Sequence, residues 1–405
     1  MSNNKTNFYV DWCAGPSVQI ELLSPIDKEE GGYMMNYTSS FRGTIRPPFA
    51  ELKVGPNALN PIKERMNDIV GKKIGLTRGN GTTPPAPAPD SEIFDDMKLL
   101  GEQLYTFLIQ QYLRADMDLR QPELYLEIGM DDDLMNFPWE MIYDGDNFLC
   151  LKQYIGRFVR SKEPQPDLMN PSTTLGSSLE NLSILLISVP KTDENKETKD
   201  FEPLPQAEEE KKAILQTLGG IENVTPKIIE PKDATFDGVY KALRRETYDI
   251  LHFCGHAYYD DKHPANSGIV LRDKIMRTGQ IASTIRARND RMTPVLCFVN
   301  ACETTKEVDI DAEKVKGGNQ LNIYGLGRAF LDTGAYLLGS RWPVNDTTAK
   351  KFAGEFYKFL LKDEQSIGQA VCSARNACKK NASDIFGWAT YIYYGDPRIY
   401  FRKAS

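Results

Sequence analysis

The strongest constraint on the fold is a series of short apolar segments in the second half of the chain, separated by segments with helical periodicity. Residues 182–189 are apolar at nearly every position, which is typical of a strand buried on both faces of a parallel sheet. Further strands are expected at 227–229, 248–255, 294–300, 335–339 and within 388–394. They alternate with predicted helices at 206–218, 236–243, 280–288, 326–332, 347–361 and 367–379. This alternation predicts an α/β fold with an open, mostly parallel sheet flanked by helices.

The first half is less regular and predicts a smaller α+β domain. Prolines and small residues dominate 80–90, which favours an exposed, extended loop. Ser91 is then expected to cap a helix that runs to about residue 114. Strands are predicted at 8–12, 18–23, 124–128, 148–151 and 156–160. Because a polar, proline-containing connection follows at 161–180, we expect one domain over 1–165 and a second over 178–405.

Composition and charge exclude several classes of function. The 405 residues carry 49 Lys and Arg against 56 Asp and Glu, a formal net charge of −7, so the basic stripe of a protein that binds nucleic acid directly is missing. No apolar run approaches the roughly 20 residues of a membrane span, and the first residues lack the apolar segment of a secretory signal. The seven cysteines are odd in number and scattered, which is typical of a reducing compartment. We therefore expect a cytoplasmic protein that does not bind membranes.

A histidine and a cysteine lie at the carboxyl ends of two predicted strands. His256 ends the strand at 248–255, and Cys302 follows the strand at 294–300. In an open parallel sheet, ligands bind in the crevice outside the carboxyl ends of the strands. Because a single helical connection separates the two strands, a right-handed crossover would make them neighbours about 4.8 Å apart. A thiol needs a nearby base to form the nucleophilic thiolate, so this placement favours nucleophilic catalysis.

Packing is the alternative explanation for cysteines and histidines in apolar segments. We assign it to His252 and to the cysteines within predicted strands and helices: Cys254, Cys297, Cys372 and Cys378. A zinc site formed by alternate residues of one strand is disfavoured, because His252 and His256 would be roughly 13 Å apart. A nucleotide-binding site is disfavoured as well, since residues 325–330 lack the third glycine and no GxxxxGKS or GxxxxGKT loop occurs. The sequence therefore predicts neither a metal nor a cofactor.

Five ordered motifs carry a resemblance to a known family. They are LPQAEE at 204–209, LHFCGH at 251–256, VNACET at 299–304, AFLDTGAYLLGSRWPVND at 329–346 and WATYIYYGDP at 388–397. With these motifs the chain resembles the CHAT-domain cysteine peptidases of the clan that contains caspases, separases and gingipains. In the first half, FPWEMIYDG at 137–145, followed by a predicted hairpin, resembles the degenerate caspase-like domain that often precedes the catalytic one.

The resemblance implies that Cys302 is the nucleophile and His256 its general base. It also suggests an oxyanion hole formed by the backbone N–H groups of Cys302 and of Ala257, the residue after the histidine. The chain departs here from the common Gly-His-Gly pattern, because Ala257 replaces the second glycine. A methyl group restricts the backbone but leaves the N–H in place, so we keep Ala257 as a donor. Asp260 and Asp261 either polarise the imidazole or belong to a solvated loop.

The resemblance also suggests a substrate pocket and a regulatory segment. Relatives in this clan frequently cleave after a basic residue, which requires an acidic group in the pocket, and Asp193 and Asp346 are the candidates near strand ends. The alternative roles are a helix N-cap for Asp346 and a solvated loop for Asp193. After Cys302, a long charged segment at 303–323 either gates the substrate groove or is a tolerated surface insertion.

We therefore predict an intracellular cysteine endopeptidase that cleaves protein substrates through a Cys302–His256 dyad. No sensor module is recognisable, so activation by a protein partner or a separate signal is expected. The resemblance also suggests a role in bacterial antiviral defence or programmed cell death. The alternative is a catalytically inactive scaffold or binding module with the same fold, because a fold alone does not imply activity.

Overall fold

The computed structural model divides the chain into two compact units. The described residues are 8–23, 34–40, 50–51, 61–62, 64–66, 68–69, 90–110, 119–131, 134, 137–160, 178–179, 181–258, 260, 266–288, 293–302, 330–331, 333–341, 344–380 and 387–403. Unit 1 comprises residues 1–14, 163–306 and 321–405, and unit 2 comprises 15–162 and 307–320. The proline-rich segment before residue 90, the segment 303–323 and most of the predicted helix at 326–332 lie outside the described residues.

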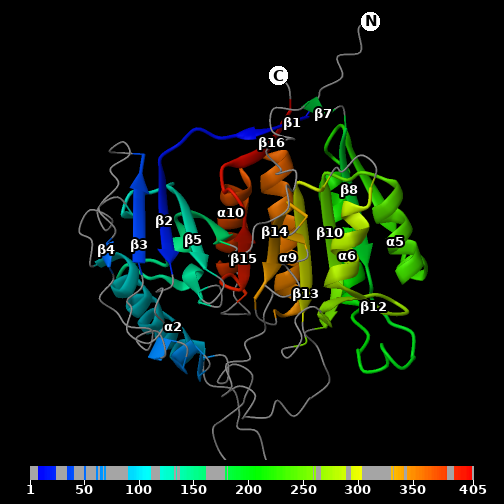
Figure 1. Cartoon of the computed structure of the whole chain (residues 1–405), viewed down its shortest axis with the longest axis horizontal. Helices are drawn as coiled ribbons and strands as arrows, with labels where there is room; N and C mark the ends of the chain where they lie inside the picture. The colour runs from blue at the N-terminus through cyan, green and yellow to red at the C-terminus, as the bar shows by residue number, and fades with distance from the viewer. Residues whose placement is uncertain are drawn as a thin grey trace, which may run out of the picture. The chain divides into compact units, whose positions relative to one another are not determined.

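Unit 1 is built on a parallel sheet with an antiparallel strand beside it. The parallel order is β9–β8–β10–β13–β14, and β15 pairs antiparallel with β14. The bounds are Leu182–Ser188 for β8, Val224–Ile229 for β9, Ile250–Tyr258 for β10, Leu296–Cys302 for β13, Tyr336–Ser340 for β14 and Tyr391–Tyr394 for β15. Figure 1 shows β8, β10, β13, β14 and β15 side by side. The predicted α/β fold with a mostly parallel sheet is therefore confirmed.

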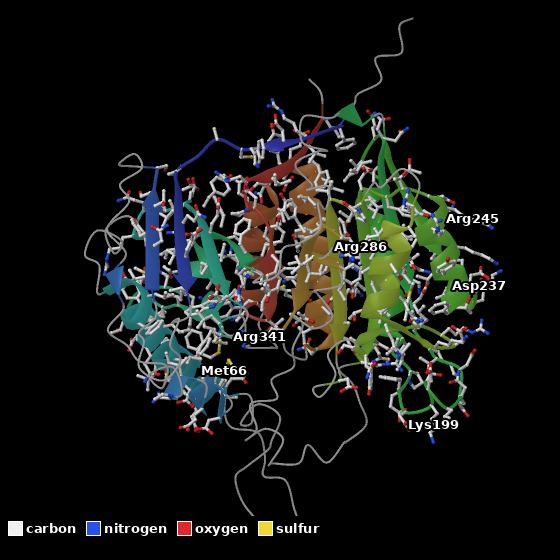
Figure 2. All side chains as sticks on the ribbon, viewed as in Figure 1. Met66, Lys199, Asp237, Arg245, Arg286 and Arg341 are labelled. Carbon is white, nitrogen blue, oxygen red and sulfur yellow. The ribbon has the colours of Figure 1, made fainter. Side chains whose placement is uncertain are left out.

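Amphipathic helices connect these strands. Their bounds are Gln206–Leu218 for α4, Phe236–Arg245 for α5, Thr278–Arg286 for α6, Asp346–Tyr357 for α9 and Ile367–Lys379 for α10, with a π-helical turn, η9, at Lys358–Lys362 and a 3-10 turn, η7, at Pro231–Asp233. Helix α4 packs against α9 and α9 against α10, while α5 packs against α6. Exposed charges such as Asp237, Arg245 and Arg286 project from the outer sides of α5 and α6 (Figure 2). The apolar sides of the helices are left to cover the sheet.

Strand β10 is longer than the sequence predicted. It does not end at His256 but continues to Tyr258, and its last two residues pair antiparallel with β11 (Gly268–Val270). Strand β11 in turn pairs with β12 (Ile275–Arg277). Ala257 therefore belongs to a strand and not to the loop that the sequence predicted after His256.

The first described residues belong to unit 1. Strand β1 (Phe8–Trp12) pairs antiparallel with β16 (Ile399–Lys403) and with β7 (Ser178–Leu179). The Trp12 indole N–H donates to a carboxylate oxygen of Asp396 at 3.1 Å, which ties β1 to the turn before β16. The sequence predicted β1 but not β16, because the polar residues in the last strand hide its alternation.

Unit 2 contains a set of paired strands, some parallel and some antiparallel, and a long helix. The strand order is β6–β5–β2–β3–β4, with β2 parallel to β5 and β5 parallel to β6. The strands are β2 Ser17–Leu23, β3 Met34–Ser39, β4 Ala50–Glu51, β5 Tyr125–Asp131 and β6 Tyr154–Arg160. Helix α2 (Asp90–Tyr105) continues as a π-helix, η2 (Thr106–Gln110). The helix therefore begins one residue before Ser91, which lies in its first turn and is not its cap.

The segment between β5 and β6 is not the hairpin that the sequence predicted. It forms two short 3-10 turns, η4 (Trp139–Met141) and η5 (Leu149–Leu151), joined by an isolated bridge between Tyr143 and Phe148. Strands β5 and β6 then pair in parallel, so the chain must cross over between them. Apolar residues such as Leu149 are buried here by the turns rather than by a strand.

Candidate active site

His256 and Cys302 lie opposite each other on neighbouring strands. Strands β10 and β13 pair in parallel from Ile250 opposite Leu296 to His256 opposite Cys302, the last pair of their ladder. Paired strands lie about 4.8 Å apart. The prediction that these two strands are adjacent is confirmed. Their register places the backbones of His256 and Cys302 side by side at the carboxyl end of the parallel sheet.

A backbone carbonyl determines which ring nitrogen of His256 carries a proton. Nε2 lies 2.7 Å from the carbonyl oxygen of Glu202. A carbonyl oxygen only accepts hydrogen bonds, so Nε2 must donate and carry the proton. His256 is 2 % exposed, and its ring lies 5.5 Å from the ring of Phe201. In the neutral imidazole, Nδ1 is therefore the nitrogen that can accept a proton.

The segment that carries Glu202 is anchored to the strand pair β11–β12. The Asn195 amide donates to the carbonyl of Asp273 at 2.8 Å. Phe201 forms a buried cluster with Val270 and Ile275. The chain that leads to Glu202, whose carbonyl contacts His256, is thus anchored at Asn195 and at Phe201. The role of Glu202 could not be predicted from the sequence, because a backbone carbonyl is present in every residue and leaves no pattern of side chains.

The two aspartates predicted for a substrate pocket differ in their surroundings. Asp346 is the first residue of α9, but the helix is capped by Asn345, whose side chain accepts from the backbone N–H of Thr348 at 2.8 Å. The predicted capping role of Asp346 is therefore wrong. Burial raises the pKa of Asp346, the charge of Glu210 raises it further and the charge of His256 lowers it. Asp193 instead accepts a hydrogen bond from Arg272 at 2.9 Å.

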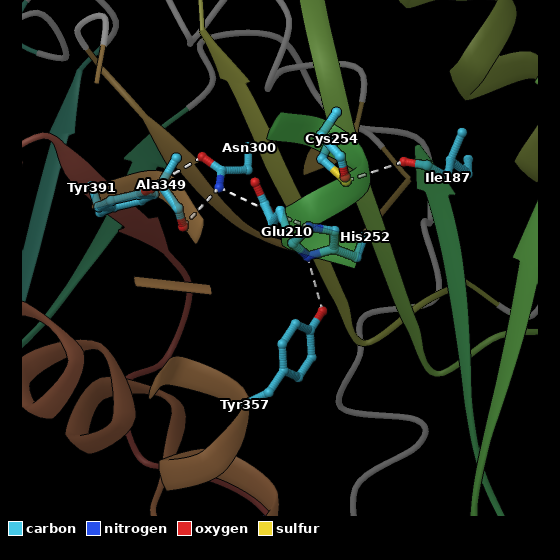
Figure 3. Close-up of polar contacts among 9 residues, drawn as sticks. Ile187, Glu210, His252, Cys254, Asn300, Ala349, Tyr357 and Tyr391 are labelled. Atoms are coloured by element: carbon cyan, nitrogen blue, oxygen red, sulfur yellow. Dashed lines mark hydrogen bonds and ion pairs between the residues drawn. The ribbon is translucent and has the colours of Figure 1, made fainter. Parts of the chain in front are cut away.

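A buried set of hydrogen-bonded side chains, which we call the Asn300 network, includes Asn300, two residues before Cys302, and His252, four residues before His256 (Figure 3). A single oxygen of the Glu210 carboxylate lies 2.8 Å from His252 Nε2 and accepts from the Asn300 amide at 2.9 Å. His252 Nδ1 lies 3.1 Å from the hydroxyl of Tyr357. The hydroxyl of Tyr391 donates to the Asn300 side-chain oxygen at 3.1 Å. The five members come from α4, β10, β13, α9 and β15, so the network joins five elements at this end of the sheet.

A metal site is the alternative use of part of this network. Among the described residues, Glu210, His252 and Cys254 offer ligand atoms within 4.8 Å of one another. Those atoms already have partners, because His252 Nε2 bonds to Glu210 and the Cys254 thiol donates to the carbonyl of Ala207 at 3.5 Å. A thiol that donates is protonated, whereas a metal ligand must be a thiolate. The donor set therefore fits a hydrogen-bonded core better than a metal centre.

Comparison with known proteins assigns the family. The CHAT domain family model matches residues 98–396, most of the chain. The chain belongs to the CHAT domain family. The predicted resemblance is therefore confirmed, and the match includes the strand ends of this CHAT domain at His256 and Cys302.

Solved structures similar to this CHAT domain chain include a separase complex and a gingipain. One is the Saccharomyces cerevisiae separase–securin complex, with 10 % identity, a TM-score of 0.49, and coverage of 94 % of this chain and 30 % of that chain. Another is the Arg-specific cysteine proteinase gingipain R, with 12 % identity, a TM-score of 0.44, and coverage of 85 % of this chain and 76 % of that chain. The CHAT domain chain thus spans less than a third of the separase chain. No curated protein matches it. Every described helix is too short or too polar to cross a lipid bilayer.

The other cysteines of strands and helices in this CHAT domain have inert surroundings. Cys254, Cys297, Cys372 and Cys378 are all buried, as predicted. Burial, followed by the charge of Glu210, raises the pKa of Cys254 well above its usual value, and burial raises the pKa of Cys297 as well. Burial also raises the pKa of Cys372 to about 11. Thiols with raised pKa values stay protonated near neutral pH and are poor nucleophiles.

We expect Cys254→Ala to lower the free energy of unfolding by about 1 kcal/mol and to leave catalysis unchanged. The substitution removes one buried sulfur and its weak hydrogen bonds, and it changes neither His256 nor Cys302. Chemical denaturation measures the stability change, and cleavage of a peptide substrate measures activity. A loss of activity much larger than the loss of folded protein would contradict a purely structural role for Cys254.

Proposed function

We propose that this CHAT domain protein is a cysteine endopeptidase that uses Cys302 as nucleophile and His256 as general base. The observation that carries the proposal is the register of β10 and β13, in which the two residues pair at the carboxyl end of the sheet. The Glu202 carbonyl supports it by orienting the His256 imidazole. The raised pKa values of the buried cysteines support it too, because they leave those thiols without nucleophilic character.

In the proposed mechanism, His256 Nδ1 takes the proton of the Cys302 thiol while the Nε2–H stays bonded to the Glu202 carbonyl. The thiolate attacks the carbonyl carbon of the scissile peptide bond, and the oxygen becomes an oxyanion. Backbone N–H groups of Cys302 and Ala257 stabilise that charge, each contributing about 3–4 kcal/mol. The imidazolium returns the proton to the leaving amine. Water, deprotonated by His256, then hydrolyses the thioester and regenerates the thiol.

We place a basic side chain of the substrate near Asp346. Helix α9 begins at this residue. The charge of His256 lowers the pKa of its carboxyl, against the larger effects of burial and of Glu210, which supports an acidic group within electrostatic range of His256. Asp193, the other candidate, already forms an ion pair with Arg272 at 2.9 Å, so it is the weaker choice. Cleavage after Lys or Arg follows from this proposal.

Profiling the full-length chain with a peptide library tests the specificity. We expect cleavage after Lys or Arg, with Asp346→Asn lowering kcat/KM for these substrates by about tenfold through the loss of one charge pair. Asp193→Asn is the matched control and should leave the preference unchanged. Cleavage after apolar or acidic residues by the wild-type protein would refute the acidic pocket.

The proposal extends to the biological setting. A role in bacterial antiviral defence or cell death follows from the family resemblance. A cytoplasmic location follows from the number and scatter of the cysteines, and activation by a protein partner or signal follows from the lack of a recognisable sensor module in the sequence. Copurification of a partner with the Cys302→Ala variant, which would trap an activator or substrate, tests the activation by a partner.

A further inference from the structure

Asn300 is the member of the Asn300 network that belongs to the strand of the proposed nucleophile. Asn300 lies in β13, two residues before Cys302. Its amide nitrogen donates to Glu210 on α4 at 2.9 Å and to the carbonyl of Ala349 on α9 at 3.4 Å. Its oxygen accepts from Tyr391 on β15 at 3.1 Å. One side chain thus fixes the end of β13 to three other elements.

A second hydrogen bond fixes the same strand end. The hydroxyl of Ser340, at the end of β14, donates to the carbonyl of Ala301 at 3.1 Å. Ala301 is the residue directly before Cys302. The backbone that leads into Cys302 is therefore held from the helices through Asn300 and from the neighbouring strand through Ser340.

Stability alone does not explain this polar core. Burying polar and ionisable groups costs free energy, and well-packed apolar side chains at such positions are often at least as stabilising. Asn300, Glu210 and His252 are nevertheless nearly fully buried. Hydrogen bonds differ from apolar contacts in being directional, and a fully bonded network holds its members in one geometry. The hydrogen bonds of the Asn300 network therefore act on β13 at a residue two positions before Cys302.

We propose that Asn300 is a positioning residue, which holds the end of β13 so that Cys302 stays in register with His256. The inference rests on the proposed peptidase function. Glu210 fixes the amide of Asn300 and is itself fixed by His252, which bonds to Tyr357. Tyr391 fixes the opposite edge of the amide. None of these side chains needs to touch the substrate, because each acts through the backbone of β13.

A pair of tyrosines on β15 provides a matched test. Tyr391 and Tyr393 are both fully buried, and the hydroxyl of Tyr393 donates to the carbonyl of Asp396 at 3.1 Å, outside the network. Tyr391→Phe and Tyr393→Phe each remove a single buried hydroxyl. We expect Tyr391→Phe to lower kcat about fivefold, with KM unchanged, through the loss of one hydrogen bond to Asn300. Tyr393→Phe should leave kcat unchanged.

Asn300→Ala removes all three contacts and should have the larger effect. A displacement of about 1 Å in a catalytic group lowers rates by about 100-fold, which is the expected loss in kcat. KM should change much less than kcat, because Asn300 is not a proposed pocket residue and its contact with α9 at Ala349 is the longest of the three. Both parameters are measured with the full-length chain on a fluorogenic peptide chosen from the library.

Alkylation of Cys302 gives a measurement that would not change if Asn300 had a purely structural role. Iodoacetamide labelling of the full-length chain is followed against pH, with the labelled residue located by mass spectrometry. In Asn300→Ala, half-maximal labelling of Cys302 should require a higher pH, because a displaced thiolate is less stabilised by the His256 imidazolium. The variant retains Glu210 and Asp346, so the effect of the Glu210 charge on the pKa of Asp346 is not removed with the amide of Asn300. The profile of Tyr393→Phe should match that of the wild type.

The outcomes separate this inference from the proposed function. If Tyr391→Phe and Asn300→Ala fold and keep the wild-type kcat and labelling profile, the positioning role is wrong. It is also wrong if Tyr393→Phe loses as much kcat as Tyr391→Phe, since the loss then reflects a loosened core. Should Asn300→Ala not fold, the two tyrosine variants decide. Wild-type cleavage by Cys302→Ala would overturn the peptidase function, and the labelling profiles would still test Asn300.

Discussion

We expect the replacement of Cys302 or His256 with alanine to abolish peptide cleavage, with a loss in kcat of at least about 10³-fold. Without the thiol no thioester forms, and without the imidazole the thiol stays protonated near neutral pH. In the proposed mechanism one proton transfer requires both residues. The double variant Cys302→Ala/His256→Ala should therefore be no slower than the slower single variant. Cleavage of a library-derived peptide by the full-length chain measures all three rates.

Folding must be shown to survive both substitutions. Neither residue belongs to the Asn300 network, so we expect the thermal unfolding of Cys302→Ala to match that of the wild type. His256→Ala loses the bond to the Glu202 carbonyl and the contact with Phe201, and a lower melting temperature is expected. If Cys302→Ala keeps its activity on a cognate peptide, this site is not a peptidase centre and the scaffold function takes its place.

The sequence predicted the parallel sheet and the neighbourhood of β10 and β13 because both depend on strong local patterns. Buried parallel strands are apolar throughout, and parallel strands that follow each other through a helical connection, here through α6, tend to be neighbours in the sheet. The burial of Cys254 and Cys297 followed from the same patterns. The apolar residues at 149–151 misled the prediction, since a buried 3-10 turn has the composition of a short strand.

Contacts between distant segments were not predictable in this way. The Glu202 carbonyl acts through its backbone, which any residue could supply. Glu210 stands within a helix rich in glutamates, and only the packing of α4 on the sheet distinguishes the buried carboxylate from its exposed neighbour Glu209. The pairing of β1 with β16 joins opposite ends of the chain, and no local pattern encodes such a contact.

Glu140→Ala is expected to destabilise unit 2 by about 3–5 kcal/mol, because it removes the buried carboxylate that pairs with the buried guanidinium of Arg157. Arg157 is 0 % exposed and Glu140 2 % exposed. The Arg157 Nε donates to a Glu140 oxygen at 2.8 Å, and a terminal nitrogen bonds to the other oxygen and to the carbonyl of Phe137 at 3.0 Å. This ion pair ties the FPWE motif to β6. Hydrogen–deuterium exchange of peptides from β5 and β6, with equilibrium denaturation, measures the loss.

Two further variants show whether the loss of stability comes from removing the carboxylate that pairs with Arg157. Asp95→Ala breaks an exposed pair with Lys98 on α2 of the same unit and should change stability little, because exposed ion pairs contribute weakly. The double variant Glu140→Leu/Arg157→Met replaces both charges with apolar groups, so it should be more stable than Glu140→Ala although it carries one more substitution. If the double variant is the less stable of the two, the ion pair itself stabilises the fold, and Glu140 does more than neutralise Arg157.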